Sequence, residues 1–278
     1  MNFVKMHGLG NDFVMVNLMK DKLPGDLNAL ARHVCHRQFG IGADGMILIL
    51  PSEQADVKMR IINSDGSEAE MCGNGIRCLA KLVYEHKIVQ SPFISVETLA
   101  GIIRPEVILD ESNQVQGIKV DMGEPRLLPE AVPVLMSGEK VLSQKLNVDG
   151  TEVEITAVSM GNPHCIVFVP DIALAPVTTL GPLLEKHPAF PAKTNVEFVE
   201  VSNRQEVKMR VWERGAAETM ACGTGACAVV VAGVLNNKTQ RQVLVHLKGG
   251  DLEINWSDNN HVFMTGPAEM VFEGRYFV

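Results

Sequence analysis

The chain repeats part of its own sequence at a spacing of about 150 residues. The tetrapeptide Val-Lys-Met-Arg at 57–60 recurs at 207–210, and the same offset places Cys72 on Cys222. Further pairs keep the same order at nearly the same offset: Gly10 with Gly161, Asn11 with Asn162, Glu68 with Glu218, Gly73 with Gly223, Gly75 with Gly225 and Cys78 with Cys227. Repeats of solenoid proteins are only about 20–50 residues long. The repeat therefore predicts two copies of one domain.

Each copy shows the same succession of expected elements. The shared tetrapeptide alternates apolar and polar residues, as in a strand, and a polar loop, a Cys-Gly-x-Gly turn and a helix follow it. In the first copy Ile76, Leu79, Ala80 and Val83 lie on one helical face. The alignment predicts a helix for the equivalent second segment too, although its run of valines at 229–231 alone favours a strand. We expect mixed α+β domains, with the Pro-, Glu-, Ser- and Gly-rich stretch 127–150 as a surface connection.

Charge and composition exclude several classes of protein. The chain has 25 Lys and Arg against 33 Asp and Glu, a net charge of −8, and 5% aromatic residues. This composition argues against a nucleic-acid or membrane-surface partner. The N-terminus lacks the pattern of a signal peptide, and the longest apolar stretch, 226–235, is half the ~20 residues that a membrane span needs. We expect a cytoplasmic protein whose six cysteines are reduced.

Two of these cysteines precede a glycine-rich turn and a helix. A helix N-terminus has unpaired backbone N–H groups and a partial positive charge, which favour a thiolate and attract a carboxylate. Cys72 and Cys222 could therefore supply an acid and a base at one carbon, as inversion of a stereocentre requires. The alternative interpretation is structural: the glycines only permit two tight turns, and the cysteines before them are buried packing residues. No nucleotide-binding loop or cofactor lysine motif is evident, so the chemistry is expected to belong to side chains.

The loops before the two cysteines differ in their charged residues. Through the offset, Glu213 and Arg214 occupy the positions of Asn63 and Ser64. Arg can bind a carboxylate with two parallel hydrogen bonds and Glu can hold an ammonium, so the pair could bind an amino-acid group. A surface ion pair is the alternative. His164 could adjust the pKa of a thiol or have a structural role. Asn11, Asn162 and Asn195 lie in turn-like sequence, where asparagine commonly has a structural role.

The sequence resembles the diaminopimelate epimerase family. Residues 63–77 match the family signature without a mismatch, and Glu213-Arg214-Gly215 with Ala221-Cys222-Gly223-Thr224-Gly225 resemble its second active-site segment. Further matches lie at 8–13, 161–164 and 194–197. The resemblance covers nearly the whole chain. It implies an isomerase, independent of pyridoxal phosphate and of any other cofactor or metal, that interconverts LL- and meso-2,6-diaminopimelate in lysine and cell-wall precursor biosynthesis.

The resemblance also implies roles for individual residues. Cys72 and Cys222 would be the catalytic acid and base, and His164 and Glu213 would tune the pKa values of the thiols. Ten residues would bind substrate: Asn11, Asn63, Gly73, Asn74, Asn162, Asn195, Glu213, Arg214, Gly223 and Thr224. Gly45 stands where one family variant has Gln, so no contact is assigned to it.

The fold that the resemblance implies is an α/β (α+β) chain with two pseudo-symmetric domains from an internal duplication. Each is a curled mixed or antiparallel sheet around a central helix. The expected domains are residues 1–118 with 267–278, and residues 119–266. A homodimer is implied as well; Phe272 stands where the family has a Tyr at the dimer contact.

The residues alone leave three alternative functions open. A proline-racemase-like enzyme would use the same two-thiol logic on another amino acid. A thiol redox or metal-binding protein would use the neighbouring His33, Cys35 and His36, although these do not have the spacing of common zinc sites. An amino-acid-binding module without catalysis would need neither thiol.

Overall fold

The computed structural model describes residues 1–20, 23 and 25–277. The chain divides into two compact units, one formed by Met1–Asp121 with the C-terminal segment from Thr265, the other by Met122–Met264. Among the described residues, no helix is long and apolar enough to cross a membrane.

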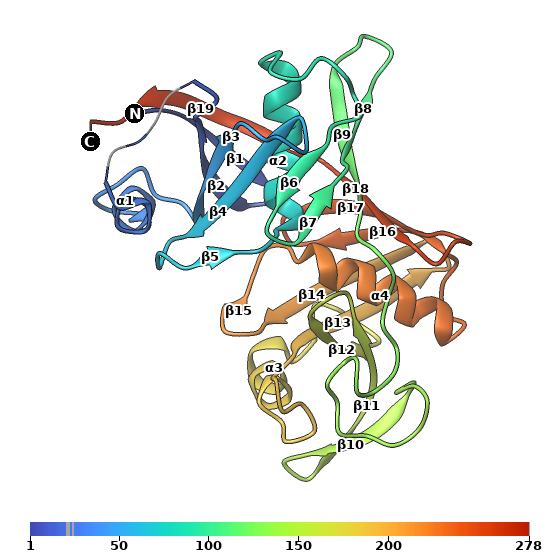
Figure 1. Cartoon of the computed structure of the whole chain (residues 1–278). Coiled ribbons are helices and arrows are strands. Elements are labelled where there is room, and N and C mark those ends of the chain that lie inside the picture. Colours follow the sequence, from blue (N-terminus) through green and yellow to red (C-terminus); the bar gives the residue numbers. More distant parts are fainter. Residues whose placement is uncertain (21–22, 24, 278) are drawn as a thin grey trace. The chain divides into compact units, whose positions relative to one another are not determined.

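The first unit contains a mixed sheet, labelled in Figure 1, with strand order β19-β1-β2-β3-β4-β6-β7 and β5 paired with β4. These strands are β1 (Asn2–Gly8), β2 (Asn11–Asn17), β3 (Gly45–Leu50), β4 (Val57–Asn63), β5 (Glu68–Ala69), β6 (Val96–Thr98), β7 (Gly101–Ile103) and β19 (Glu269–Arg275). A hairpin of β8 (Glu106–Leu109) and β9 (Val115–Asp121) and two helices, α1 (Leu27–Cys35) and α2 (Gly73–Glu85), complete the unit. The pairs β2–β3 and β4–β6 are parallel.

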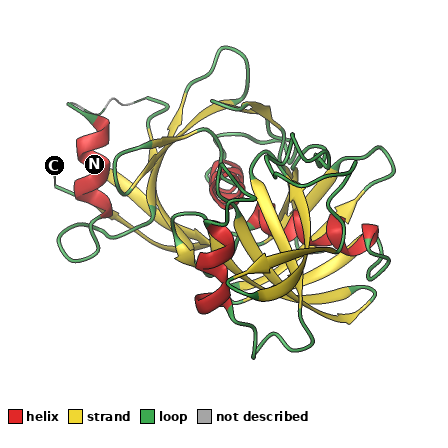
Figure 2. Ribbon diagram, turned by 90° about the horizontal axis from the view of Figure 1, so that it is seen from below, coloured by secondary structure: helices red, strands yellow, loops and turns green. Residues whose placement is uncertain are grey.

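Helix α2 is the centre of this unit, and Figure 2 looks along its axis. It packs against β1, β2, β3, β8 and β9. The predicted apolar face is buried, with Ile76, Leu79, Ala80 and Val83 all inaccessible to solvent. Burial of a Leu- or Val-sized side chain contributes about 1.5–3 kcal/mol, so this face stabilises the helix inside its curled sheet.

The second unit repeats this plan, with strand order β10-β11-β12-β13-β14-β16-β17-β18 and β15 paired with β14. Its strands are β10 (Gln144–Val148), β11 (Thr151–Ser159), β12 (Pro163–Phe168), β13 (Asn195–Asn203), β14 (Glu206–Glu213), β15 (Ala217–Glu218), β16 (Gln242–Leu247), β17 (Gly250–Trp256) and β18 (Val262–Gly266). Its helices are α3 (Val177–Glu185) and α4 (Gly223–Leu235). The parallel pairs are β12–β13 and β14–β16, at the places that β2–β3 and β4–β6 hold in the first unit.

The matching order of parallel and antiparallel pairs confirms the internal duplication predicted from the sequence. Helix α4 packs against β11, β12, β13, β16 and β17, as α2 packs against its own sheet. The valines at 229–231 are helical and fully buried. Helix α4 is apolar on nearly every side because its sheet surrounds it, which explains why helical periodicity is absent from its sequence.

The expectation of a purely surface connection at 127–150 is wrong. This segment contains β10, and Val132, Val134 and Val141 belong to a buried cluster with Phe190 and Phe198. Its prolines and polar residues form turns that place widely spaced valines in the core, so average composition concealed the buried positions.

Candidate active site

Both cysteines singled out by the repeat are helix N-caps. Cys72 has extended backbone angles before α2, and its Sγ accepts a hydrogen bond from the Gly75 N–H at 3.5 Å. Cys222 has the same extended conformation before α4. Cys72 is half-buried and Cys222 is buried. The two thiols therefore occupy equivalent positions in the two units.

The first backbone N–H groups of each helix are available to a ligand. The first N–H bonded within α2 is that of Ile76, and within α4 it is that of Ala226. In the described part of the chain, the N–H groups at 73–74 and 223–224 donate to no other group. Such N–H groups, with the positive end of the helix dipole, form a binding site for a carboxylate.

Around Cys72, the polar contacts are made by asparagines. The thiol donates to Asn11 Oδ1 at 3.7 Å, and Asn74 Nδ2 donates to the same oxygen at 3.1 Å. Asn11 Nδ2 donates to Asp44 Oδ2 at 2.8 Å, which fixes the orientation of this amide. Asn63 ends β4, and its Nδ2 donates to Ser67 Oγ at 3.0 Å. The structure thus brings Asn11 and Asn74 to Cys72, while the side-chain contact of Asn63 lies within its own loop.

Asp44, which bonds Asn11, belongs to an ionic network. Arg37 bridges Asp12 and Asp44 at 3.0 and 2.8 Å, and Lys5 pairs with Asp12 at 2.6 Å. Burial of Asp12 opposes its ionisation, but hydrogen bonds from Arg37 and Lys5 outweigh it and lower the pKa of the carboxyl. Asp44 and Arg37 were not predicted from the sequence.

Around Cys222 a longer chain of hydrogen bonds runs into the core. Cys222 Sγ lies 3.6 Å from Thr224 Oγ1, and Asn162 Nδ2 donates to Thr224 Oγ1 at 3.3 Å. Asn162 Oδ1 lies 3.0 Å from His164 Nε2, and His164 Nδ1 lies 2.7 Å from Glu197 Oε1. The side chains of His164 and Glu197 are completely buried. The structure thus links the predicted His164 to Cys222 through two other side chains.

Burial and nearby carboxylates disfavour a thiolate at Cys222. Burial, followed by Glu213 and Glu197, raises the pKa of the Cys222 thiol well above its ordinary value, whereas Thr224 opposes the rise. Burial also raises the pKa of the Glu213 carboxyl, against hydrogen bonds that include one from Thr219 at 2.5 Å. Both groups therefore favour their protonated forms more than they would in water.

The Glu213-Arg214-Gly215 loop is held by buried groups. Asn195 Oδ1 accepts from the Arg214 N–H at 2.9 Å, and Asn195 Nδ2 donates to Pro163 O at 2.9 Å. Glu185, at the end of α3, accepts from the Gly215 N–H at 3.2 Å and from the Trp212 indole at 2.8 Å. Arg214 is exposed, and its Nη1 donates to Ala192 O at 3.0 Å. Sequence reasoning did not single out Glu185.

The four remaining cysteines are packing residues. Cys35, Cys78, Cys165 and Cys227 are at most 2% exposed. Burial raises the pKa of the Cys35 thiol to about 11 and that of Cys78 to about 12. No disulfide joins any two of the six cysteines, all of which lie among the described residues.

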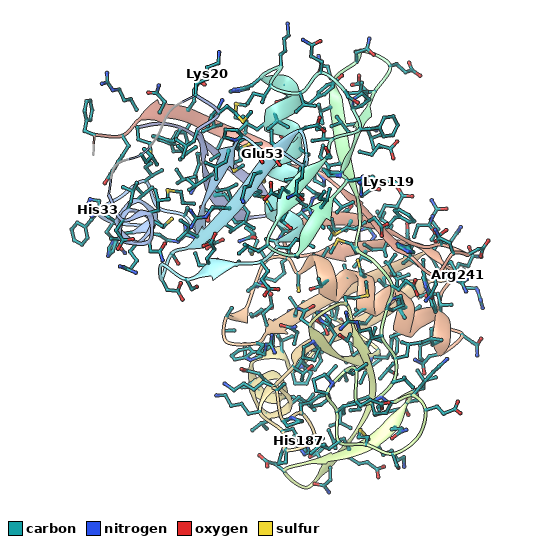
Figure 3. The ribbon with its side chains drawn as sticks, in the orientation of Figure 1. Lys20, His33, Glu53, Lys119, His187 and Arg241 are labelled. Carbon is teal, nitrogen blue, oxygen red and sulfur yellow. The ribbon has the colours of Figure 1, made fainter. Side chains whose placement is uncertain are left out.

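The proposed metal-binding cluster does not form. His33 is exposed on α1 (labelled in Figure 3), Cys35 is buried, and His36 Nδ1 accepts from the backbone N–H groups of Gln38 and Phe39. Among residues 1–20, 23 and 25–277, no three His, Cys, Asp or Glu side chains converge in a geometry that could hold a metal ion.

Solved structures with the same fold include proteins that are named for different functions. A phenazine biosynthesis protein of the PhzF family from Bacillus anthracis matches with a TM-score of 0.72 at 17% identity, covering 100% of this chain and 99% of that one. A probable proline racemase from Agrobacterium radiobacter matches with a TM-score of 0.71 at 16% identity, covering 100% and 93%. At these identities the likeness establishes the fold alone.

Sequence comparison is more specific. The family model for diaminopimelate epimerase matches residues 3–128 and 156–271. Proteins named diaminopimelate epimerase from Moorella thermoacetica and Pelotomaculum thermopropionicum are 61% and 58% identical over 277 residues, covering 99% of each chain. One from Geobacillus thermodenitrificans is 56% identical, covering 99% of this chain and 96% of that protein. The chain belongs to the diaminopimelate epimerase family.

Proposed function

We propose that this chain interconverts LL- and meso-2,6-diaminopimelate, a step of lysine and cell-wall precursor biosynthesis. The observation that carries the proposal is the pair of equivalent helix N-termini, each capped by a cysteine, in a chain 61% identical to a protein named diaminopimelate epimerase. Loss of either thiol should prevent inversion, because inversion requires proton removal on one face of the carbon and proton delivery on the other.

In the proposed mechanism, one thiolate removes the α-proton and the other thiol supplies a proton to the opposite face. Cys72 and Cys222 exchange these roles when the reaction runs in reverse. As the proton leaves, negative charge moves onto the carboxylate at the reacting carbon. The N–H groups at 73–74 and 223–224 would bind this carboxylate and stabilise the added charge. The mechanism uses no cofactor.

The remaining polar residues would hold the substrate and adjust the thiols. Glu213 and Arg214 would bind the ammonium and carboxylate groups of an amino-acid centre, since their chemistries are complementary. The asparagines of both units would bind the substrate's polar groups: Asn11, Asn63, Asn74, Asn162 and Asn195. His164 and Glu213 would tune the thiols, a role that the raised pKa of Glu213 supports.

We also propose a homodimer in the cytoplasm. Strand β19 lies at the edge of its sheet, and Met270, Val271 and Phe272 on it are 37–54% exposed. An exposed apolar edge strand is suited to pairing with a second copy. The compartment follows from the chemistry, because two catalytic thiols must stay reduced.

Solvent exchange tests the mechanism. In deuterated water the wild-type chain should convert LL-diaminopimelate to the meso form and place deuterium at the inverted α-carbon. Cys72→Ala and Cys222→Ala should each lower net inversion at least a thousandfold, since each removes one of the two proton carriers. Cys78→Ala is the matched control, because its thiol is buried inside α2, and it should keep nearly full turnover. Turnover near wild type in either N-cap variant would eliminate the two-thiol assignment.

A further inference from the structure

The arginine that ends the repeated Val-Lys-Met-Arg tetrapeptide keeps the same partner in both copies. Arg60 Nε and Nη2 donate to the two carboxylate oxygens of Glu68 at 2.7 and 2.9 Å. Arg210 Nε donates to Glu218 Oε1 at 2.8 Å. These hydrogen bonds lower the pKa values of both carboxyl groups, so each pair joins two charges at neutral pH.

The lysines of the tetrapeptide have different partners in the two copies. Lys58 Nζ donates to Glu97 on β6 at 2.8 Å, whereas Lys208 Nζ donates to Glu200 on β13 at 2.8 Å. By the matching strand orders of the two units, β13 corresponds to β3 and not to β6. The lysine partners have thus diverged between the copies, while the Arg–Glu pair is retained, which indicates a role that both units share.

The two Arg–Glu pairs have the same place in equivalent hairpins. Strand β5 pairs with the end of β4, with Glu68 opposite Ile62, and β15 pairs with the end of β14, with Glu218 opposite Trp212. Each arginine lies two residues before the residue opposite its glutamate, so the pair is a diagonal contact on one face of the hairpin. Because β5 and β15 have only two residues each, their backbone pairing alone is weak, and the side-chain contact reinforces it.

The side chains of both pairs are partly shielded from solvent. They are 30% and 26% exposed for Arg60 and Glu68, and 24% and 15% exposed for Arg210 and Glu218. Fully exposed ion pairs contribute little to stability, but two parallel hydrogen bonds or a network of charges make the contribution measurable. The first pair has the parallel bonds, and the second belongs to a network, since Lys248 Nζ lies 3.4 Å from Glu218.

Each pair joins the two ends of a loop that carries proposed substrate-binding residues. Asn63 lies within the first loop, and Glu213 and Arg214 lie within the second. The N-cap cysteine of the following helix comes four residues after each glutamate. The contact between arginine and glutamate therefore restrains both the loop and the extended segment that leads into the helix.

We propose that Arg60–Glu68 and Arg210–Glu218 are positioning pairs, which hold the segments before Cys72 and before Cys222 in place. The inference rests on the proposed function for its catalytic meaning. Proton transfer requires each thiol to be held close to the reacting carbon, and the neighbouring helix N–H groups must face the same carboxylate. A pair that fixes the chain four residues away restricts how far the thiol can drift from that position.

The second unit adds a further contact to its segment. In the turn between β16 and β17, the Gly249 N–H donates to Met220 O at 2.9 Å. In the equivalent turn between β6 and β7, the Ala100 N–H donates to Thr98 Oγ1 at 3.1 Å, inside its own hairpin. The segment before Cys72 should therefore depend more strongly on its Arg–Glu pair.

Glu68→Gln and Glu218→Gln test the proposal in the full chain, because each keeps the shape and removes one charge of a pair. Glu97→Gln and Glu200→Gln are the matched controls, since they do the same to the lysine pairs. Amide hydrogen exchange, resolved by peptide, is first measured without substrate. Glu68→Gln should speed exchange about tenfold in 61–74 and less than about twofold in 211–224. Glu218→Gln should speed it about threefold in 211–224 alone, and the controls should leave both segments within about twofold of wild type.

Steady-state kinetics with LL-diaminopimelate gives the second readout. A displacement of about 1 Å at a reacting group can cost about a hundredfold in rate, so kcat should fall about tenfold or more in Glu68→Gln and in Glu218→Gln. KM should rise about threefold or more in Glu218→Gln alone, because its loop carries Glu213 and Arg214. The reversed pair, Arg60→Glu with Glu68→Arg, should recover most of the kcat lost by either reversal alone, since the contact is restored.

Equal acceleration of exchange in both segments, or equal losses of kcat in the controls, would indicate general destabilisation and overturn the positioning role. Unchanged kcat in Glu68→Gln, or a reversed pair no more active than its single reversals, would overturn it as well. Absence of α-proton exchange in the wild type would refute the proposed function instead. The two failures are distinguishable because the hydrogen-exchange pattern is measured without substrate.

Discussion

Glu185 joins helix α3 to the loop that carries Glu213 and Arg214. Its carboxylate is 4% exposed and accepts two hydrogen bonds, from the Trp212 indole at 2.8 Å and from the Gly215 N–H at 3.2 Å. Glu185→Gln keeps the shape but directs one amide N–H group toward a donor. It therefore loses one hydrogen bond to a charged acceptor, which is worth about 1.5–3 kcal/mol. We expect a loss of that size in the free energy of unfolding.

The same change should weaken substrate binding more than the chemical step. Neither partner of Glu185 is a thiol, but the Gly215 N–H fixes the turn from which Arg214 extends. KM should rise at least fivefold while kcat falls less than threefold. Urea unfolding followed by Trp fluorescence measures the first effect, and steady-state kinetics with LL-diaminopimelate measures the second.

Trp212→Phe gives the control for this interaction, because it removes one donor and leaves the Gly215 bond in place. A double-mutant cycle should give a coupling of about 0.5–3 kcal/mol between the two positions. An unfolding free energy within about 0.5 kcal/mol of wild type for Glu185→Gln, together with an unchanged KM, would refute the reasoning.

Three further substitutions probe the residues packed beneath the two helix N-termini and the buried Glu213. Gly225→Ala would place a Cβ 2.7 Å from Oε1 of Glu197, which is completely buried and in contact with His164, so overpacking should cost about 1–3 kcal/mol and lower turnover at least tenfold. Gly75→Ala makes one contact shorter than 3 Å, with the flexible end of Ile47 at 2.8 Å, and the helix-propensity gain of about 1 kcal/mol should roughly offset it. Equal losses of the two variants in urea unfolding and in turnover would contradict this difference. For Glu213, burial raises the pKa of the folded carboxyl, so its contribution to stability is full below the unfolded value and is lost as pH rises through the folded one. Glu213→Gln should therefore gain stability relative to wild type between pH 4 and pH 8, and parallel urea midpoints over that range would show the prediction to be wrong.

The duplication could be predicted from the sequence because its matches cluster where geometry is least tolerant of change. Cys72 and Cys222 precede glycines at which an added Cβ would meet buried side chains, so both copies keep the same spacing. The helical state of 229–231 followed from the alignment alone. Its valines favour a strand locally, and only burial on all sides of α4 makes the helix stable.

The supporting carboxylates could not be predicted because their contacts depend on strand pairing. Glu197 reaches His164 across the parallel pair β12–β13, which joins segments some 30 residues apart with a helix between them. Asp44 directly precedes β3 and meets Asn11 at the start of the equivalent pair β2–β3. A one-residue change of register would turn either side chain to the other face of its sheet, and local sequence patterns do not specify that register.

The duplication explains why two thiols exist, and the differences between the copies explain how they can act unequally. Two identical half-sites would bind both ends of a substrate in the same way and would hold their protons with equal strength. Here the first copy has Asn63 and, beneath its helix N-terminus, the apolar Phe13 and Ile47. The second copy has Glu213 and the His164–Glu197 pair at these positions. The divergent positions thus surround a helix N-terminus that both copies retain. In the proposed mechanism the common frame would supply a carboxylate-binding helix end and a thiol to each unit, while the charged substitutions in the second would distinguish one amino-acid centre and one proton carrier from the other.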